Sequence, residues 1–277
     1  MPSSIKVIKL NGEQEPFSLK KVYGSAMRAG ASSFLARTIS SEIEKEVYPG
    51  ITTAEIFKKV KERLRKENPK SALRFSLKEA MKKLGPAGFV FEDFVRQVLS
   101  RYGMDVSGNM ILKGRCSKYE IDFLAEKEDI VYVGECKYRN SAGDKIDINV
   151  CLKSFAILDD VKDNLRFKGK EVNYLIVTNT KFTDEAMRYA ACKKMELLGW
   201  SYPKDLGLED MVEERKLYPV TILPSFKGYL AEALRNEKIM LVEDILSLNV
   251  DKFVKKVNIP RKQFETLLKE AEILMDK

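Results

Sequence analysis

The chain has 277 residues and a formal net charge of +8, and 44% of its residues are hydrophobic and 32% charged. This length and composition predict about two soluble globular domains with substantial cores. The sequence contains no histidine, which excludes Ser-His-Asp and Cys-His nucleophiles, histidine-ligated zinc, and the nucleases and deaminases that depend on histidine.

The first segment, residues 1–88, is predicted to fold as a short β-hairpin followed by a helix bundle. Two strand-like stretches flank Asn11 and Gly12, a dipeptide typical of hairpin turns, and they cover residues 5–10 and 15–17. Helical patterns follow at residues 19–29, 32–47, 54–65 and 71–84. Gly85, Pro86 and Gly88 then interrupt the pattern, so we place the first domain boundary at residue 88.

The second segment, residues 89–223, alternates helical and strand patterns. Helices are predicted at residues 91–102, 150–165 and 183–197, and strands at 110–112, 119–125, 130–138 and 172–178, with short edge strands at 199–202 and 218–223. The apolar, β-branched run at 172–178 is typical of a strand that is buried on both faces. This order predicts a mixed sheet flanked by helices, so the chain as a whole is an α/β multidomain protein.

The third segment, residues 224–277, is predicted to be a small helical domain. Its helical patterns cover residues 241–248, 250–257 and 262–275. The stretch resembles a degenerate helix-hairpin-helix or SAM-like domain, with a turn at residues 258–260 that is followed by Arg261 and Lys262. These two cations could contact phosphate, and a module for helical packing or dimerisation is the alternative.

Positive charge is concentrated at the start of the chain. Residues 1–88 hold 18 lysines and arginines against 9 acidic residues, whereas residues 89–226 hold 21 against 23, and residues 227–277 hold 10 against 9. A basic region of this kind suits nucleotide phosphates or a nucleic-acid backbone. A solvated basic surface without a ligand is the alternative.

Several other classes of protein are excluded by what the sequence lacks. No apolar run approaches the roughly 18 residues of a membrane span, and the sequence has neither a signal-peptide core nor a P-loop motif. The four cysteines form no C-x-x-C pair, which argues against structural zinc. We therefore expect a cytoplasmic protein without membrane contact, in which Cys136 and Cys151 are reduced and point inward.

The residues most informative about chemistry are Asp122, Glu135 and Lys137. Asp122 lies in one strand pattern, and Glu135 and Lys137 lie late in the next one. Alternate side chains of a strand share a face, so Glu135 and Lys137 should point the same way and Cys136 the opposite way. The acidic turn at residues 126–129 would join the two strands antiparallel, which brings both carboxylates together.

Two carboxylates beside a lysine suit the hydrolysis of a phosphodiester. Asp122 and Glu135 are the expected ligands of Mg²⁺ or Mn²⁺, because these cations prefer oxygen and keep positions open for water and phosphate. Such a metal lowers the pKa of bound water and stabilises charge that develops on phosphorus. Lys137 would orient or help to deprotonate that water, or contact the phosphate. Glu92, on the preceding helical pattern, could supply a further acid.

Residues 89–222 resemble the PD-(D/E)XK nuclease superfamily in its Mrr-like restriction endonuclease branch. The matching elements, in chain order, are residues 91–92, 121–122, 133–137, 174–179 and 182–186. The resemblance implies metal-dependent DNA cleavage, with Asp122 and Glu135 as metal ligands, Lys137 as the catalytic lysine and Glu92 as an auxiliary acid. The chain has Glu135 where this branch often has Gln, and Ile121 where it has Gly.

Residues 5–85 resemble the ATP-cone, a regulatory nucleotide-binding domain. The resemblance implies that ATP or dATP binds as an effector without hydrolysis. Lys9 and Lys21 would neutralise phosphates, Gly12 lets the backbone turn, and Thr53 would hydrogen-bond the ligand. Val7 and Glu15 complete the matching site residues. Leu10 stands where the family has a basic residue, which removes one phosphate contact. A degenerate domain for dimerisation or DNA contact is the alternative.

Together these patterns predict a Mg²⁺-dependent DNA endonuclease that ATP or dATP regulates. Each chain has one site, so simultaneous cleavage of both strands would need a homodimer with two-fold symmetry. Two alternatives stay open. One is a non-catalytic, nucleotide-responsive DNA-binding or regulatory protein, and the other is a nuclease that acts on RNA or on branched repair intermediates.

Overall fold

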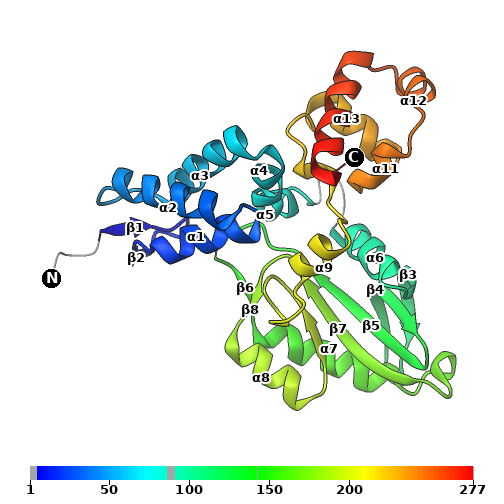
Figure 1. Cartoon of the computed structure of the whole chain (residues 1–277). Helices are drawn as coiled ribbons and strands as arrows, with labels where there is room; N and C mark the ends of the chain where they lie inside the picture. The colour runs from blue at the N-terminus through cyan, green and yellow to red at the C-terminus, as the bar shows by residue number, and fades with distance from the viewer. Residues whose placement is uncertain (1–4, 86–90, 142, 277) are drawn as a thin grey trace. The chain divides into compact units, whose positions relative to one another are not determined.

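The computed structural model describes residues 5–85, 91–141 and 143–276 (Figure 1). The chain divides into two compact units. Unit 1 contains the described residues up to 80, together with residues 220–233 and 243–276, and unit 2 contains residues 81–219 and 234–242. The helices near the C-terminus thus share a unit with the N-terminal segment. The boundary predicted at residue 88 lies outside the described residues.

Unit 1 begins with the predicted hairpin. Strands β1 (Lys6–Ile8) and β2 (Gln14–Pro16) pair antiparallel, with Val7 opposite Glu15. Five helices follow, which are α1 (Leu19–Arg28), α2 (Ser33–Glu46), α3 (Thr53–Glu67), α4 (Pro69–Phe75) and α5 (Leu77–Met81). The single helix predicted at 71–84 is wrong. Asn68 caps α4 with Pro69 at its first turn, and the helix breaks at Ser76, the C-cap of α4, before α5 begins at Leu77.

Side-chain caps define the starts of the first three helices. The side chains of Ser18 and Ser32 accept hydrogen bonds from the backbone amides of Lys21 and Leu35, at the starts of α1 and α2 respectively. Thr52 forms a reciprocal capping box with Glu55 at the start of α3. The apolar faces of these helices bury one core together with Val7 of the hairpin, through Ala26, Ile39, Ile43, Val60 and Leu64.

The later part of unit 1 is helical, as predicted. It contains most of α10 (Gly228–Asn236) and all but the first residue of α11 (Val242–Leu246). It also contains the whole of α12 (Val250–Val257) and of α13 (Arg261–Met275). Phe253 and Phe264 join α12 to α13, with ring centroids 5.0 Å apart. Helix α13 also packs against α4, where Lys70 and Asp276 form an ion pair.

Unit 2 is built on a five-stranded mixed sheet with the order β3-β4-β5-β7-β9 (Figure 1). The strands are β3 (Asp105–Lys113), β4 (Lys118–Lys127), β5 (Ile130–Lys137), β7 (Glu171–Thr178) and β9 (Glu196–Leu198). The first three pair antiparallel, and β5-β7 and β7-β9 pair parallel. A separate two-stranded parallel sheet pairs β6 (Lys145–Ile146) with β8 (Lys181–Phe182).

Helices cover this sheet and bury its core. Helix α6 (Phe91–Arg101) packs against β3, β4 and β5, while α7 (Ile148–Val161) packs against β7 and α8 (Asp184–Cys192) against β9. The core between the sheet and α7 and α8 includes Val133, Tyr174, Ile176, Cys151 and Ala186. The strand predicted at 172–178 is confirmed as β7, which lies between β5 and β9 and is largely buried. Among the described residues, no helix is long and apolar enough to span a membrane.

The predicted elements are wrong in the last part of the sheet. Helix α8 ends at Cys192, and residues 196–198 form β9, where we expected the helix to continue. The predicted strand at 199–202 is only a bridge between Gly199 and Tyr202. The predicted strand at 218–223 is instead a 3-10 turn at Val220–Ile222, and α9 (Leu208–Glu214) had no prediction. Short apolar runs can be buried in either conformation, so composition does not separate them.

Candidate functional site

The antiparallel pair β4-β5 positions Asp122 and Glu135. Its register pairs Phe123 with Gly134, and the next step along the two strands reaches Asp122 and Glu135. A Cβ atom on Gly134 would lie 2.1 Å from the Phe123 ring. Only glycine therefore fits opposite Phe123, and this close contact fixes the two strands immediately beside the carboxylates.

Each of the two carboxylates is held through one oxygen. The amide of Cys136 donates a hydrogen bond of 2.7 Å to Oδ2 of Asp122. Lys137 donates to Oε1 of Glu135 in an ion pair, and Glu135 is buried. Within the described parts of the chain, Oδ1 of Asp122 and Oε2 of Glu135 accept no hydrogen bond from protein. The structure thus brings Asp122, Glu135 and Lys137 together and leaves one oxygen of each carboxylate for a ligand.

Glu92 approaches the same cluster from α6. Burial raises the pKa of the Glu92 carboxyl, and the negative charge of Asp122 raises it further, while Arg96 on the same helix lowers it. Burial also raises the pKa of Asp122; the hydrogen bond from Cys136 opposes that shift, and the charge of Glu135 adds to it. Three carboxylates therefore gather around one lysine, so negative charge is in excess at this end of the sheet.

The donor chemistry of this cluster fits a hard divalent cation. Magnesium is commonly held by one or two carboxylates, with water and phosphate filling its other positions, and Asp122 and Glu135 supply two such groups. The excess of negative charge around Lys137 would be neutralised by such an ion. In residues 5–85, 91–141 and 143–276, however, no group of three or more histidine, cysteine, aspartate or glutamate side chains is arranged to hold a metal.

The cysteines agree with the expectation of reduced thiols. Cys136 and Cys151 are buried, Cys116 and Cys192 are exposed, and all four are free. Burial, with the charges of Asp122 and Glu92, raises the pKa of the Cys136 thiol well above its ordinary value. The Cys136 side chain is therefore a neutral packing group, and its amide rather than its sulfur contacts the carboxylates.

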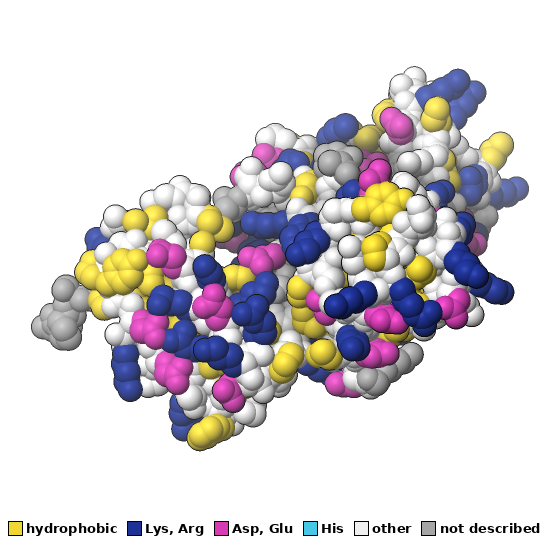
Figure 2. Space-filling view, turned by 90° about the horizontal axis from the view of Figure 1, so that it is seen from above, with side chains coloured by type: hydrophobic (Ala, Val, Ile, Leu, Met, Phe, Trp, Pro, Cys, Tyr) yellow, Lys and Arg dark blue, Asp and Glu magenta, His cyan; other side chains and the backbone are white. Residues whose placement is uncertain are grey.

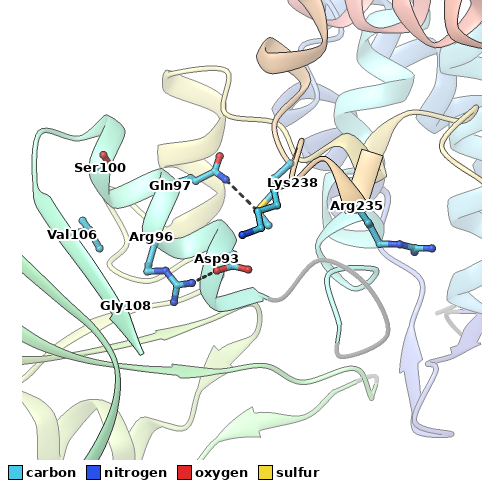
Figure 3. A pocket seen from close by; sticks show the side chains of 9 residues that line it. Asp93, Arg96, Gln97, Ser100, Val106, Gly108, Arg235 and Lys238 are labelled. Carbon is cyan, nitrogen blue, oxygen red and sulfur yellow. Dashed lines mark hydrogen bonds and ion pairs between the residues drawn. The ribbon is translucent and has the colours of Figure 1, made fainter. Parts of the chain in front are cut away.

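Sequence reasoning missed a pocket that lies beside this cluster (Figure 3). Its volume is about 520 Å³, and it is lined by residues of α6 and β3 and by Arg235, Lys238 and Met240. Arg96 belongs to both places, because it lines the pocket and donates to the main-chain oxygen of Asp122 at 3.3 Å. No sequence motif marks this pocket, since Lys238 lies far along the chain from α6.

The hairpin of unit 1 carries a second group of predicted site residues. The Glu15 carboxylate accepts a hydrogen bond of 2.8 Å from the Lys21 ammonium and lies 3.6 Å from that of Lys9. Lys9 also forms an ion pair of 3.0 Å with Glu13. The ion pair with Lys21 is the main cause that lowers the pKa of Glu15. The structure thus brings both predicted phosphate-binding lysines together, and acidic side chains of the hairpin compensate both of them.

The other predicted residues of this group lie near the hairpin in different roles. Val7 is buried in the core, and Gly12 has φ of 84°, the left-handed conformation that glycine adopts without strain. The hairpin lies next to the start of α3, because the amide of Ile8 donates to Ile51 at 3.0 Å and Ile8 bridges to Thr52. Thr52 provides the cap of α3, and Thr53 is the first residue of that helix.

Positive and negative charges are mixed on one face of the molecule (Figure 2). On the face seen in Figure 2, lysine and arginine side chains are interspersed with aspartate and glutamate. Arg261, a candidate phosphate contact, instead forms ion pairs with Asp251 and Glu265. The turn before it places Asn258 in the left-handed region, with φ of 51°. Arg261 therefore has an evident role in joining α12 to α13.

Comparison with protein families gives two matches in this chain. Residues 5–79 match the ATP cone domain, and residues 218–275 match the family described as AF1548-like, C-terminal. The N-terminal resemblance is thereby confirmed, and it points to nucleotide-responsive regulation. The C-terminal match is to a family other than the helix-hairpin-helix or SAM-like domains that the sequence suggested. Neither match includes the carboxylate cluster, so the resemblance to Mrr-like nucleases stays a prediction.

Two proteins that are similar to this chain are described without a function. An uncharacterized protein of Archaeoglobus fulgidus is 33% identical over 180 residues, which cover 64% of this chain and 97% of that protein. The crystal structure of AF1548, a protein of unknown function, is 28% identical with a TM-score of 0.56, and the match covers 67% of this chain and 97% of that one. The chain therefore belongs to the family of this Archaeoglobus fulgidus protein and carries an ATP cone domain at its N-terminus.

Proposed function

We propose that unit 2 is a metal-dependent nuclease that hydrolyses DNA phosphodiesters, with the active site of an Mrr-like PD-(D/E)XK enzyme. The observation that carries the proposal is the convergence of Asp122, Glu135 and Lys137 on β4 and β5, with Glu92 approaching from α6. These four residues come from three elements in the order that the resemblance requires. Without a bound cation, the repulsion among these carboxylates lowers the stability of the folded chain.

Each residue has a role that follows from its contacts. The unpartnered oxygens of Asp122 and Glu135 would hold the divalent cation, and Glu92 would contact its water. When bound, Mg²⁺ or Mn²⁺ would supply Lewis acidity and a water of lowered pKa. Lys137 orients Glu135 through their ion pair and can contact the phosphate as a point charge. The Cys136 amide holds Asp122 in place.

One observation favours a non-catalytic protein as the second candidate. Lys137 and Glu135 satisfy each other in an ion pair, as two residues on one face of a strand do when they only stabilise a sheet. In that case the chain is a nucleotide-responsive protein that binds DNA without cleaving it. The two candidates differ in whether Lys137 is needed for a reaction.

The ATP cone domain supplies the regulatory part of the proposal. We infer that ATP or dATP binds at the hairpin as an effector and alters the activity or assembly of the chain. Nucleotide binding there requires the lysines of the hairpin to exchange Glu13 and Glu15 for phosphate. A homodimer would place two sites on the two strands of a duplex.

Cleavage of supercoiled plasmid in Mg²⁺ or Mn²⁺ tests the proposal. We expect nicking or linearisation by the wild type and losses of at least about 100-fold in Asp122→Asn and Lys137→Ala. Lys127→Ala is the matched control, because Lys127 is exposed at the opposite end of β4. It should cleave like the wild type.

Two results would overturn this assignment. Equal cleavage by the wild type and both site variants would point to another site or to a contaminant. A wild type that cuts neither plasmid, RNA nor branched DNA, with ATP and dATP also present, would favour the binding protein. Cleavage of RNA or branched DNA alone, if it depends on Asp122 and Lys137, would keep the chemistry and change the substrate.

A further inference from the structure

The pocket beside α6 is enriched in positive charge. Its lining contains three cationic side chains, Arg96, Arg235 and Lys238, against the single carboxylate of Asp93. Asp93 already forms an ion pair with Arg96. In the described parts of the chain, neither Arg235 nor Lys238 has an ion-pair partner. The pocket therefore holds positive charge that an anionic ligand can neutralise.

Arg96 connects this pocket to the carboxylate cluster. It donates to Oδ1 of Asn109 at 3.4 Å and to the main-chain oxygen of Asp122 at 3.3 Å. A Cβ atom on Gly108 would lie 2.7 Å from the Arg96 side chain, so the glycine makes room for Arg96 to lie across β3. A ligand in the pocket thus contacts a residue that also touches the strand segment carrying Asp122.

Lys238 is held in place by its own backbone. Helix α10 ends in a Schellman motif. The backbone amide of Lys238 donates to the carbonyl oxygen of Arg235, and the amide of Ile239 donates to that of Leu234, both at 2.9 Å. Ile239 and Leu234 are buried, and Lys238 takes the left-handed conformation with φ of 56°. Figure 3 shows the Lys238 side chain extending toward Arg96 and Asp93, whereas Arg235 points away at the rim.

We propose that this pocket binds a backbone phosphate of the nucleic-acid strand on which the carboxylate cluster acts, with Lys238 and Arg96 as its contacts. The inference rests on the proposed nuclease function, since that function supplies the polyanion. The pocket has a volume of about 520 Å³, which exceeds what one phosphate needs and suits a nucleotide unit of a longer strand. Arg96 then places a bound phosphate next to the segment that carries Asp122.

The left-handed conformation of Lys238 permits a substitution that separates charge from folding. Glycine favours this conformation, so Lys238→Gly removes the cation without loss of stability. Lys194 offers a matched control, because it also follows a helix in a Schellman motif, with φ of 54°, and does not line the pocket. Lys194→Gly changes the net charge equally at an equivalent backbone position.

Binding is measured with the full-length chain and a fluorescent 20-base-pair DNA duplex, by anisotropy without divalent metal and over a range of salt concentrations. We expect Lys238→Gly to weaken binding about five- to tenfold at low salt and to reduce the slope of log K against log salt by about 1. Lys194→Gly should bind like the wild type, and the melting temperature of Lys238→Gly should not fall. Lys238→Glu should weaken binding further.

Equal affinity of Lys238→Gly and Lys194→Gly would overturn the inference. Competition by AMP or inorganic phosphate at concentrations near the Kd of the duplex would also overturn it, by showing that the pocket takes free phosphate. Because binding is measured without metal, its outcome is independent of cleavage. A cleaving wild type with unchanged binding in Lys238→Gly rejects the pocket alone, whereas weakened binding with no cleavage by the wild type rejects the nuclease alone.

Discussion

Two charged clusters in this protein are built on opposite principles. On the hairpin of unit 1, Lys9 and Lys21 are matched by Glu13 and Glu15, and these side chains are mostly exposed. In unit 2, three carboxylates gather around Lys137 at the end of a mostly buried strand pair. Pairing lowers the pKa of Glu15 on the hairpin, whereas burial and repulsion raise the pKa of Asp122 on the sheet.

The difference indicates how each cluster would respond to a ligand. The hairpin cluster is already neutral, so a nucleotide must displace glutamate side chains from the lysines before its phosphates bind. The sheet cluster carries uncompensated negative charge, so a divalent cation would relieve repulsion as it binds. A ligand thus replaces existing interactions at the first cluster and supplies a missing one at the second.

The largest expected effect is stabilisation of unit 2 by metal. A cation at a hundredfold excess over its Kd should stabilise the wild type by about 2.7 kcal/mol, measured as a rise in melting temperature with Mg²⁺ or Mn²⁺. Asp122→Asn should abolish the rise. Without metal this variant should be at least as stable as the wild type, because the asparagine oxygen can still accept from Cys136.

Lys127→Ala provides the control for this measurement and should keep the full rise with metal. An equal rise in Asp122→Asn would place the cation elsewhere. A wild type that shows no rise at millimolar metal would remove the distinction between the two clusters, because the excess of carboxylates would then have no ligand to neutralise it.

A smaller effect is expected at the hairpin. Glu15→Gln frees Lys21 from its ion pair, and exposed pairs of this kind are weak. We therefore expect ATP or dATP to bind about two- to fivefold more tightly, by titration calorimetry, and Lys21→Ala to bind more weakly. Glu44→Gln, an exposed change on α2, should leave the affinity unchanged. Weaker binding in Glu15→Gln would mean that Glu15 contacts the nucleotide itself.

The smallest effect concerns the pH dependence of stability. The pKa of the Glu92 carboxyl is higher in the folded chain than in the unfolded chain. Ionisation of Glu92 therefore lowers the free energy of unfolding as the pH rises above the pKa that Glu92 has in the unfolded chain. This loss of stability reaches its full size once the pH also exceeds the pKa of Glu92 in the folded chain. Glu92→Gln should raise the free energy of unfolding at pH 7 by about 0.5 kcal/mol, a small value because Glu92 is partly exposed. The gain should vanish toward pH 4.

Urea unfolding of the wild type and of Glu92→Gln at pH 4 and pH 7 tests whether the substitution raises the free energy of unfolding at pH 7 alone. The matched variant Glu120→Gln removes an exposed carboxylate from β4 and should show little difference between the two pH values. A loss of stability in Glu92→Gln at pH 7 would mean that the glutamate makes a favourable contact in its ionised form.

Local sequence signals were sufficient for several parts of this fold. Asn11 and Gly12 mark the hairpin, and the pattern over residues 250–257 coincides with α12. The spacing of Asp122 and Glu135 brings the carboxylates together because a short turn joins neighbouring antiparallel strands, so their distance depends on nearby residues alone.

Features that depend on distant parts of the chain could not be predicted in this way. The parallel pairing of β9 with β7 required knowing that α8 stops at Cys192, yet the mixed charged and apolar residues at 193–198 also suit a continued helix. The pocket beside α6 combines that helix with Lys238, and no periodicity relates them. The amide of Cys136 was missed because a backbone donor leaves no trace in residue type.

The discontinuous make-up of unit 2 has a consequence for its synthesis. Residues 234–242 belong to this unit, where Leu241 bridges to Pro219 and the amide of Val242 donates to Tyr218 at 2.9 Å. Synthesis must therefore reach residue 242 before unit 2 is complete, although the last strand of its sheet ends at Leu198. A fragment ending at residue 223 lacks this segment, including the buried Leu241 and Val242, so a gene truncated there should yield an incomplete and aggregation-prone unit 2.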